Sequence, residues 1–161
     1  MQEALHAKPV GQVVGLWRYP VKSMRGESLT TAAVSWHGFE GDRRWAFVRD
    51  DVPRSGFPWL TIRQRPNMQN FVPSFVDPSR PNQSRTMVRT PSGAEFDVTD
   101  PKLADELSAG RARVIRQDRG IFDTFPLSLI TTETIAQLGE TSGVALRTER
   151  FRPNILVETV G

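Results

Sequence analysis

Basic and amide side chains gather in four short clusters of this 161-residue sequence, each beside a predicted strand. The clusters are Val21–Ser23, Gly41–Trp45, Thr61–Pro66 and Arg150–Asn154. Lysine offers a compact positive charge and arginine a planar fork of donors, and both suit phosphate or carboxylate groups. Loops at strand ends often carry functional side chains. A single strand-end arginine is more often simply solvated, so the four clusters together are more specific than any one of them.

The stretch YPVKSMRG, which begins at Tyr19, contains the first cluster. Pro20 cannot donate to a sheet ladder, so the preceding strand should end there. Side chains of a strand alternate between its faces, which places Tyr19 and Val21 on the packed side and Lys22 on the other. The turn should then bring Ser23 beside Lys22. Two interpretations stay open at this point: a solvated turn, or a site for an anionic group away from bulk water.

Composition limits the class of protein. Hydrophobic residues make up 38% of the sequence and charged residues 24%, as in soluble globular proteins. No run approaches the roughly 20 apolar residues of a membrane span, and no apolar secretory signal is visible, so we expect a cytoplasmic protein without a membrane partner. The net charge of +3 does not predict a nucleic-acid partner. Arginine outnumbers lysine 18 to 3, which codon usage can explain, so only arginines at special positions carry weight.

Candidate catalytic and metal-ligating residues are few. The sequence has no cysteine, which excludes disulfides, thiolate ligands and cysteine nucleophiles within it. His37 lies between glycines in a turn and is more simply a solvated histidine than a proton donor. Asp42 and Asp123 form a possible acid–base pair, but Asp42 is more simply expected to orient Arg44 or cap its turn, and Asp123 to hold a loop. We therefore assign no catalytic residue and no metal ligand.

Strand-forming runs and turn residues predict a mainly β fold with a few short helices. Strands are expected over 12–19, 29–36, 43–48, 59–62, 70–76, 87–90, 94–98, 113–117, 127–130 and within 145–158. Capped helical patterns are expected over Pro101–Leu107 and Thr132–Leu138, ended by Gly110 and Gly139. The tryptophans fall on β segments and are expected in the core rather than on a stacking platform; they are Trp17, Trp36, Trp45 and Trp59.

The four motifs YPVKS, GDRRW, PLSLIT and RFRPNI occur in an order that resembles the MOSC family with its N-terminal β-barrel domain. The resemblance covers nearly the whole chain and is weak only over about 71–111. It implies a mainly β, β-barrel-like N-terminal MOSC domain over 10–117. It further implies that 118–161 is the beginning of a MOSC domain, incomplete in this sequence.

This resemblance implies a molybdenum cofactor (molybdopterin) and an oxidoreductase that reduces N-hydroxylated compounds or handles sulfur. It implies a small-molecule substrate and a ferredoxin- or cytochrome-type electron-donor protein. Carried over by motif, the cofactor-binding residues are Lys22 and Ser23 after the Tyr-Pro, Arg43 in the Asp-Arg element, and Arg152 and Asn154 in the Arg-Pro-Asn element.

One departure from the family concerns the metal. The family holds its molybdenum with a cysteine thiolate downstream of the Arg-Pro-Asn strand, and this sequence has no cysteine. Oxygen and nitrogen donors replace a soft thiolate poorly. We therefore expect the chain to be the N-terminal part of a longer protein, with an incomplete cofactor site. The alternative is a non-catalytic module that binds a phosphorylated ligand or a partner protein at the Lys/Arg strand ends; a domain that binds single-stranded nucleic acid ranks last.

Overall fold

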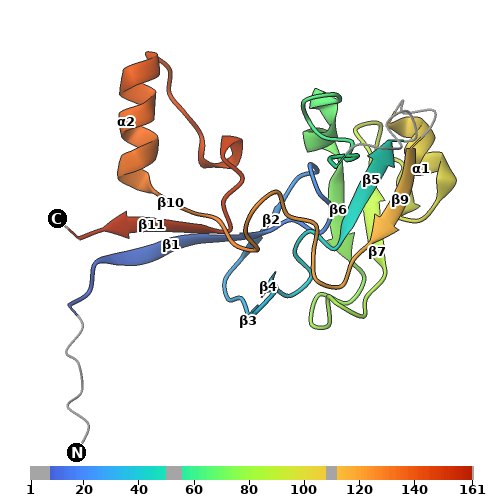
Figure 1. Ribbon diagram of the computed structural model, residues 1–161, viewed down its shortest axis with the longest axis horizontal. Helices are drawn as coiled ribbons and strands as arrows, with labels where there is room; N and C mark the ends of the chain where they lie inside the picture. Colours follow the sequence, from blue (N-terminus) through green and yellow to red (C-terminus); the bar gives the residue numbers. More distant parts are fainter. Residues whose placement is uncertain (1–7, 50–55, 108–111, 161) are drawn as a thin grey trace, which may run out of the picture. The chain divides into compact units, whose positions relative to one another are not determined.

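The computed structural model describes residues 8–49, 56–107 and 112–160, and within these ranges the fold is mainly β (Figure 1). The strands are β1 (Gly11–Arg18), β2 (Glu27–Leu29), β3 (Val34–Ser35), β4 (Gly38–Phe39), β5 (Trp45–Arg49), β6 (Val72–Phe75), β7 (Thr86–Arg89), β8 (Glu95–Asp97), β9 (Ala112–Arg116), β10 (Leu129–Thr131) and β11 (Ile155–Thr159). The α-helices are α1 (Pro101–Glu106) and α2 (Thr132–Ser142), and the short 3-10 helices are η1 (Pro66–Asn70) and η2 (Thr148–Arg150).

The chain packs as two compact units. Unit 1 combines Met1–Trp17 with Leu127–Gly161, and unit 2 is Arg18–Pro126. The division into family domains at residues 117 and 118 is a separate matter and stays a prediction.

Unit 2 is built from small antiparallel sheets around one hydrophobic core. β5 pairs with β9, β3 pairs with β4, and β7 lies between β6 and β8. The core joins side chains from all along this unit: Val21, Met24, Phe47, Leu60, Met68, Phe71, Val88, Val98, Leu103 and Leu107. Val21 and Met24 come from the YPVKSMRG stretch, so burial of apolar side chains fixes both ends of the turn that contains Lys22 and Ser23.

Within unit 1 the strands lie in the order β10-β11-β1, with α2 connecting β10 to β11. β10 and β11 are parallel, as expected for two strands joined through a helix. β11 and β1 are antiparallel, with an irregularity in the register between Val13 and Gly15. Thr131 caps α2: its hydroxyl accepts a hydrogen bond from the Thr134 N–H at 3.1 Å.

The expected mainly β fold with short helices is confirmed. Both predicted helices are present; the first begins behind Asp100, whose carboxylate accepts from the Lys102 N–H at 2.9 Å. Its predicted stop, Gly110, lies outside the described residues. The prediction that α2 ends at Gly139 is wrong. The helix continues to Ser142 and is capped by Gly143, which has a φ of 69°. The close approach of Val144, whose N–H donates to the Gly139 carbonyl, explains the glycine inside the helix.

The predicted strand 29–36 is wrong. β2 ends at Leu29, and residues 34–35 form a hairpin with β4 instead. The Ser35 hydroxyl is the physical reason, because it accepts from the His37 N–H and donates to the Gly38 carbonyl, which closes a tight turn. Trp36 lies at the tip of this turn and is 95% exposed, so its expected place in the core is also wrong. His37 is exposed, as expected for a solvated histidine.

The predicted strand 59–62 is reduced to one bridge between Trp59 and Val48. The chain then turns at Thr61, because the Gln64 side chain accepts hydrogen bonds from both the N–H and the hydroxyl of Thr61. The arginines of this third cluster, Arg63 and Arg65, are exposed. Among the described residues, no helix is long and apolar enough to cross a membrane.

Candidate anion-binding site

The turn Val21–Met24 carries the first two predicted site residues. The Met24 N–H donates to the Val21 carbonyl at 3.2 Å, and Ser23 has a φ of 69°. A residue with positive φ at this place in a turn is usually glycine. Val21 and Met24 are fully buried, so the turn is held from both sides by the core. Tyr19 and Val21 are packed as expected, and Lys22 and Ser23 are also buried rather than solvated.

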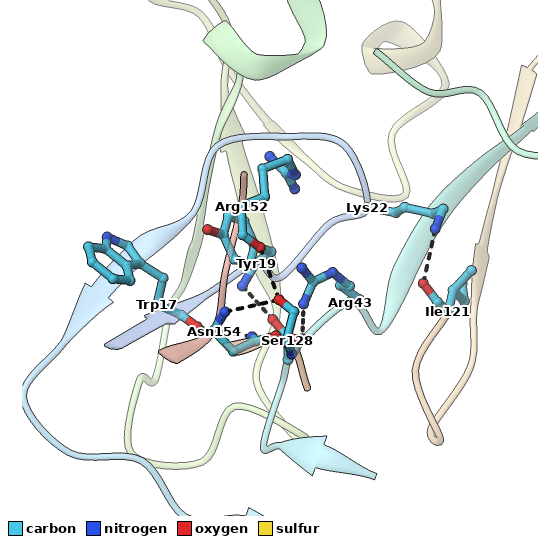
Figure 2. Close-up of polar contacts among 9 residues, drawn as sticks. Trp17, Tyr19, Lys22, Arg43, Ile121, Ser128, Arg152 and Asn154 are labelled. Carbon is cyan, nitrogen blue, oxygen red and sulfur yellow. Dashed lines mark hydrogen bonds and ion pairs between the residues drawn. The ribbon is translucent and has the colours of Figure 1, made fainter. Parts of the chain in front are cut away.

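Among the described residues, the Lys22 ammonium has two hydrogen-bond partners, both from a loop about a hundred residues downstream. Its Nζ donates to Asp123 Oδ1 at 2.6 Å. It also donates to the Ile121 carbonyl at 3.4 Å (Figure 2). The Lys22 side chain is 7% exposed, whereas the Asp123 side chain is 65% exposed. A buried ammonium requires such a negative partner, because its desolvation is costly.

Arg43 is held by a different carboxylate. Its Nη1 lies 2.5 Å from Asp42 Oδ2, and its guanidinium stacks over the Tyr19 ring, 4.6 Å from the centroid. Asp42 is fully buried, and its Oδ1 accepts from the Tyr19 N–H at 2.7 Å. The expectation that Asp42 orients Arg44 is therefore corrected: Asp42 pairs with Arg43 and with the end of β1. Arg44 donates instead to Asn82 Oδ1 at 3.3 Å, and burial lowers the pKa of its guanidinium.

Backbone pairing brings the first two clusters together. The Arg43 N–H donates to the Tyr19 carbonyl at 2.6 Å, and the Lys22 N–H donates to the Trp45 carbonyl at 2.8 Å. A parallel bridge between Val21 and Trp45 lies between these bonds. Lys22, Ser23 and Arg43 thus come from two neighbouring segments of unit 2.

A third segment, at Ile121, forms hydrogen bonds with both of these segments. The sequence analysis did not predict it as part of the site. The Ile121 N–H donates to the Arg43 carbonyl at 2.8 Å, while the Ile121 carbonyl accepts from Lys22 Nζ. One buried residue therefore contacts both predicted site residues through its backbone. Backbone groups leave no signature of residue type; the only available signal was Asp123, two positions further on.

Asn154 and Arg152 belong to unit 1. The Asn154 carboxamide links two neighbouring segments: Nδ2 donates to the Trp17 carbonyl at 3.1 Å and Oδ1 accepts from the Ser128 N–H at 3.2 Å (Figure 2). Asn154 is fully buried, so its side chain holds the start of β11 in place. Arg152 precedes it by two residues, and the Arg152 carbonyl lies 3.5 Å from the Ser128 hydroxyl, a long hydrogen bond.

An unusual backbone conformation marks three of the five predicted site residues. Among the residues that the structure describes, positive φ at a non-glycine occurs at Ser23 (69°), Arg43 (49°) and Arg152 (52°). This region costs an L-residue roughly 1–2 kcal/mol. Residues kept there despite the cost are concentrated at functional sites. The conformation is independent of the motif resemblance and selects three of the same residues.

The described residues contain no group of three or more His, Cys, Asp or Glu placed to hold a metal ion. The whole sequence also lacks cysteine. Neighbouring segments of unit 2 carry the Lys22 ammonium, the Arg43 guanidinium and the Ser23 hydroxyl, and each of the two cations lies beside its own carboxylate. This set suits an anion and does not suit a metal.

The fold is β-rich, and in unit 2 it places the candidate residues Lys22, Ser23 and Arg43 on two neighbouring segments. Residues 10–120, more than half of the chain, match the family described as the MOSC N-terminal beta barrel domain. The chain belongs to this family, and MOSC proteins are generally linked to molybdenum-cofactor binding. A comparison with curated proteins finds no match.

Proposed function

We propose that Lys22, Ser23 and Arg43 of unit 2 bind the phosphate-bearing part of a molybdenum cofactor, and that Arg152 and Asn154 of unit 1 are also cofactor-binding residues. The observation that carries this proposal is the positive φ of Ser23, Arg43 and Arg152. In a fold under no functional demand, glycine would be preferred at such positions. That they instead hold a hydroxyl and two guanidinium groups supports a need for the side chains.

The residues present fit one part of the cofactor and not another. A phosphate in a poorly hydrated site requires charge-assisted donors, and the Lys22 ammonium and Arg43 guanidinium are such donors. The metal requires a soft thiolate, which these 161 residues do not contain. A bound molybdenum cofactor supplies the redox centre; the residues of this chain bind its anionic end, orient it and exclude water around Lys22.

The activity that follows from the proposal is that of a cytoplasmic oxidoreductase. It would reduce N-hydroxylated small molecules or handle sulfur, with electrons from a ferredoxin- or cytochrome-type protein. The thiolate ligand would have to come from residues outside these 161. The 161-residue chain alone should therefore hold no stoichiometric molybdenum and should not reduce a hydroxylamine with an artificial donor. Turnover above a metal-free control would contradict the argument from ligand softness.

The second candidate function is a non-catalytic module that binds a phosphorylated ligand or a partner protein at the same strand ends. The absence of cysteine favours it. Both functions share the anion site and differ in the metal. Metal analysis separates them when the chain is joined to residues that supply a cysteine and is purified from cells that make molybdenum cofactor. The first function then predicts co-purifying molybdenum, and the second predicts none.

The anion site itself is tested by titration of the chain with inorganic phosphate, followed by calorimetry. Lys22→Gln and Arg43→Gln should each weaken binding at least tenfold, since a charge-assisted bond contributes about 1.5–3 kcal/mol. Arg116→Gln is the matched control, because Arg116 is a strand arginine outside the four motifs and pairs with the exposed Asp118. Equal losses in all three variants would indicate a general charge effect and refute the site.

A further inference from the structure

The counter-ion of Lys22 is unusually exposed for a buried cation. The Lys22 side chain is 7% exposed and that of Asp123 is 65% exposed. Within the described ranges, the bond from Lys22 Nζ is the only hydrogen bond or ion pair that Asp123 makes. The other partner of Lys22, the Ile121 carbonyl, is neutral and lies at 3.4 Å. Asp123 is therefore the group that neutralises Lys22, and Lys22 is all that holds its carboxylate.

Breaking this ion pair costs the Asp123 carboxylate little free energy but costs the buried Lys22 ammonium much more. A carboxylate that is mostly exposed recovers water when it leaves an ion pair, so its own departure costs little desolvation energy. A buried ammonium left without an anion keeps its desolvation penalty. Asp123 should consequently leave Lys22 only when another anion takes its place.

We propose that Asp123 is an exchangeable counter-ion that determines which anions Lys22 accepts. This inference rests on the proposed function, in which Lys22 binds the anionic end of a ligand. A ligand must displace Asp123, so it must be a better partner than one carboxylate. A phosphate with two negative charges and several acceptor oxygens meets that condition. A monocarboxylate such as acetate does not, because it would replace Asp123 with its own chemical equivalent and lose the advantage of a tethered group.

The test uses side-chain NMR of the 161-residue chain labelled with 15N-lysine. Only three lysines are present, so the Lys22 Nζ signal can be assigned with Lys8 and Lys102 as references. Wild type, Asp123→Asn, Asp118→Asn and Lys22→Gln are titrated in parallel with inorganic phosphate and with acetate. Asp118 is the matched control: it lies in the same loop, is 86% exposed and pairs with Arg116 at 3.2 Å.

Phosphate should shift the wild-type Lys22 signal, and acetate should not. Asp123→Asn should bind phosphate about fivefold more tightly, the factor that corresponds to an exposed ion pair of about 1 kcal/mol. It should also acquire a measurable response to acetate. Asp118→Asn removes the same charge and should stay within twofold of wild type. If Asp123→Asn perturbs the fold, Asp123→Ala serves the same purpose.

The outcomes separate this inference from the function on which it rests. Equal phosphate affinities in wild type, Asp123→Asn and Asp118→Asn, with binding lost in Lys22→Gln, would overturn the exchange and keep the anion site. A uniform gain in both Asp→Asn variants would also overturn it, as a general charge effect. No phosphate response at Lys22 in any variant would overturn the anion site and the exchange together.

Discussion

Two cation–carboxylate pairs in unit 2 have similar chemistry and opposite surroundings. Arg43 pairs with its neighbour Asp42, which is fully buried and also accepts a backbone N–H from Tyr19. Lys22 pairs with Asp123, which is mostly exposed and has no other bond among the described residues. The first carboxylate is therefore a fixed part of the fold, whereas the second can leave.

The difference shows what residue type alone does not reveal about an ion pair. A buried carboxylate with two donors orients its cation permanently, so Arg43 can present its guanidinium in one position. An exposed carboxylate neutralises its cation only until a better anion arrives. A site built from both has one preset donor and one that becomes available on binding.

The largest expected effect is on stability and contrasts the two carboxylates directly. Asp42→Ala should lower the free energy of unfolding by about 3–5 kcal/mol, because it leaves a largely buried guanidinium without its counter-ion. Asp123→Ala should lower it less, by about 1–3 kcal/mol, because the Lys22 ammonium stays buried with only the neutral Ile121 carbonyl as a hydrogen-bond partner, while no buried carboxylate is lost. Urea unfolding at neutral pH measures both, with an unchanged m-value as the check that two-state behaviour is kept. Similar losses in the two variants would remove the distinction between fixed and exchangeable pairs.

In unit 1, the buried Asn154 carboxamide is likewise held by hydrogen bonds that are part of the fold. Asn154→Ala should cost about 2–3 kcal/mol, since it leaves the Trp17 carbonyl and the Ser128 N–H without their side-chain partner. Amide hydrogen exchange should rise at Ser128 in particular. Ser142→Ala, at the exposed end of α2, is the matched control and should change stability by less than about 0.5 kcal/mol. A loss no larger than that of the control would mean that Asn154 does not hold β11.

The sequence predicts those features of the structure that neighbouring residues determine, and it does not predict contacts between residues far apart in the chain. The capped helices and the β5 and β7 strands follow from neighbouring residues and were predicted. The hairpin at Trp36 depends on one serine hydroxyl, which a strand-forming pattern conceals. The candidate site residues come from motifs and stay a prediction, and the motifs did not indicate the partners of those residues. The Lys22–Asp123 pair joins residues 101 positions apart, and Ile121 acts through its backbone, so neither contact has a local signal.

Two variants of Ser23 distinguish the cost of its positive φ from the contribution of its hydroxyl to phosphate binding. Ser23→Gly should raise the free energy of unfolding by about 1 kcal/mol, because glycine adopts a φ of 69° without steric cost. Phosphate affinity should fall about threefold with loss of the hydroxyl, the value of an ordinary hydrogen bond. Ser23→Ala keeps the strain and loses the hydroxyl, so it should weaken binding without stabilising the chain. A Ser23→Gly chain that is less stable than wild type would contradict the strain.

The smallest expected effect concerns Glu133, an exposed carboxylate that is held by hydrogen bonds, in contrast to Asp123. Glu133 is exposed, yet hydrogen bonds from its own backbone N–H and from Thr159 lower its pKa to about 2 from an ordinary value of 4.5. A lowered pKa means that the ionised form stabilises the fold above about pH 4.5, and that this contribution is lost as pH falls toward 2. Glu133→Gln should flatten the acid side of a thermal-melting profile over that interval. An unchanged profile would contradict the assigned bonds.

The most direct test of the account is a crystal structure of the chain with inorganic phosphate. We expect a phosphate on Lys22 Nζ, the Asp123 carboxylate turned to solvent, and the Arg43–Asp42 pair in place. Asp123 still bound to Lys22, with phosphate elsewhere or displacing Asp42 from Arg43, would contradict it.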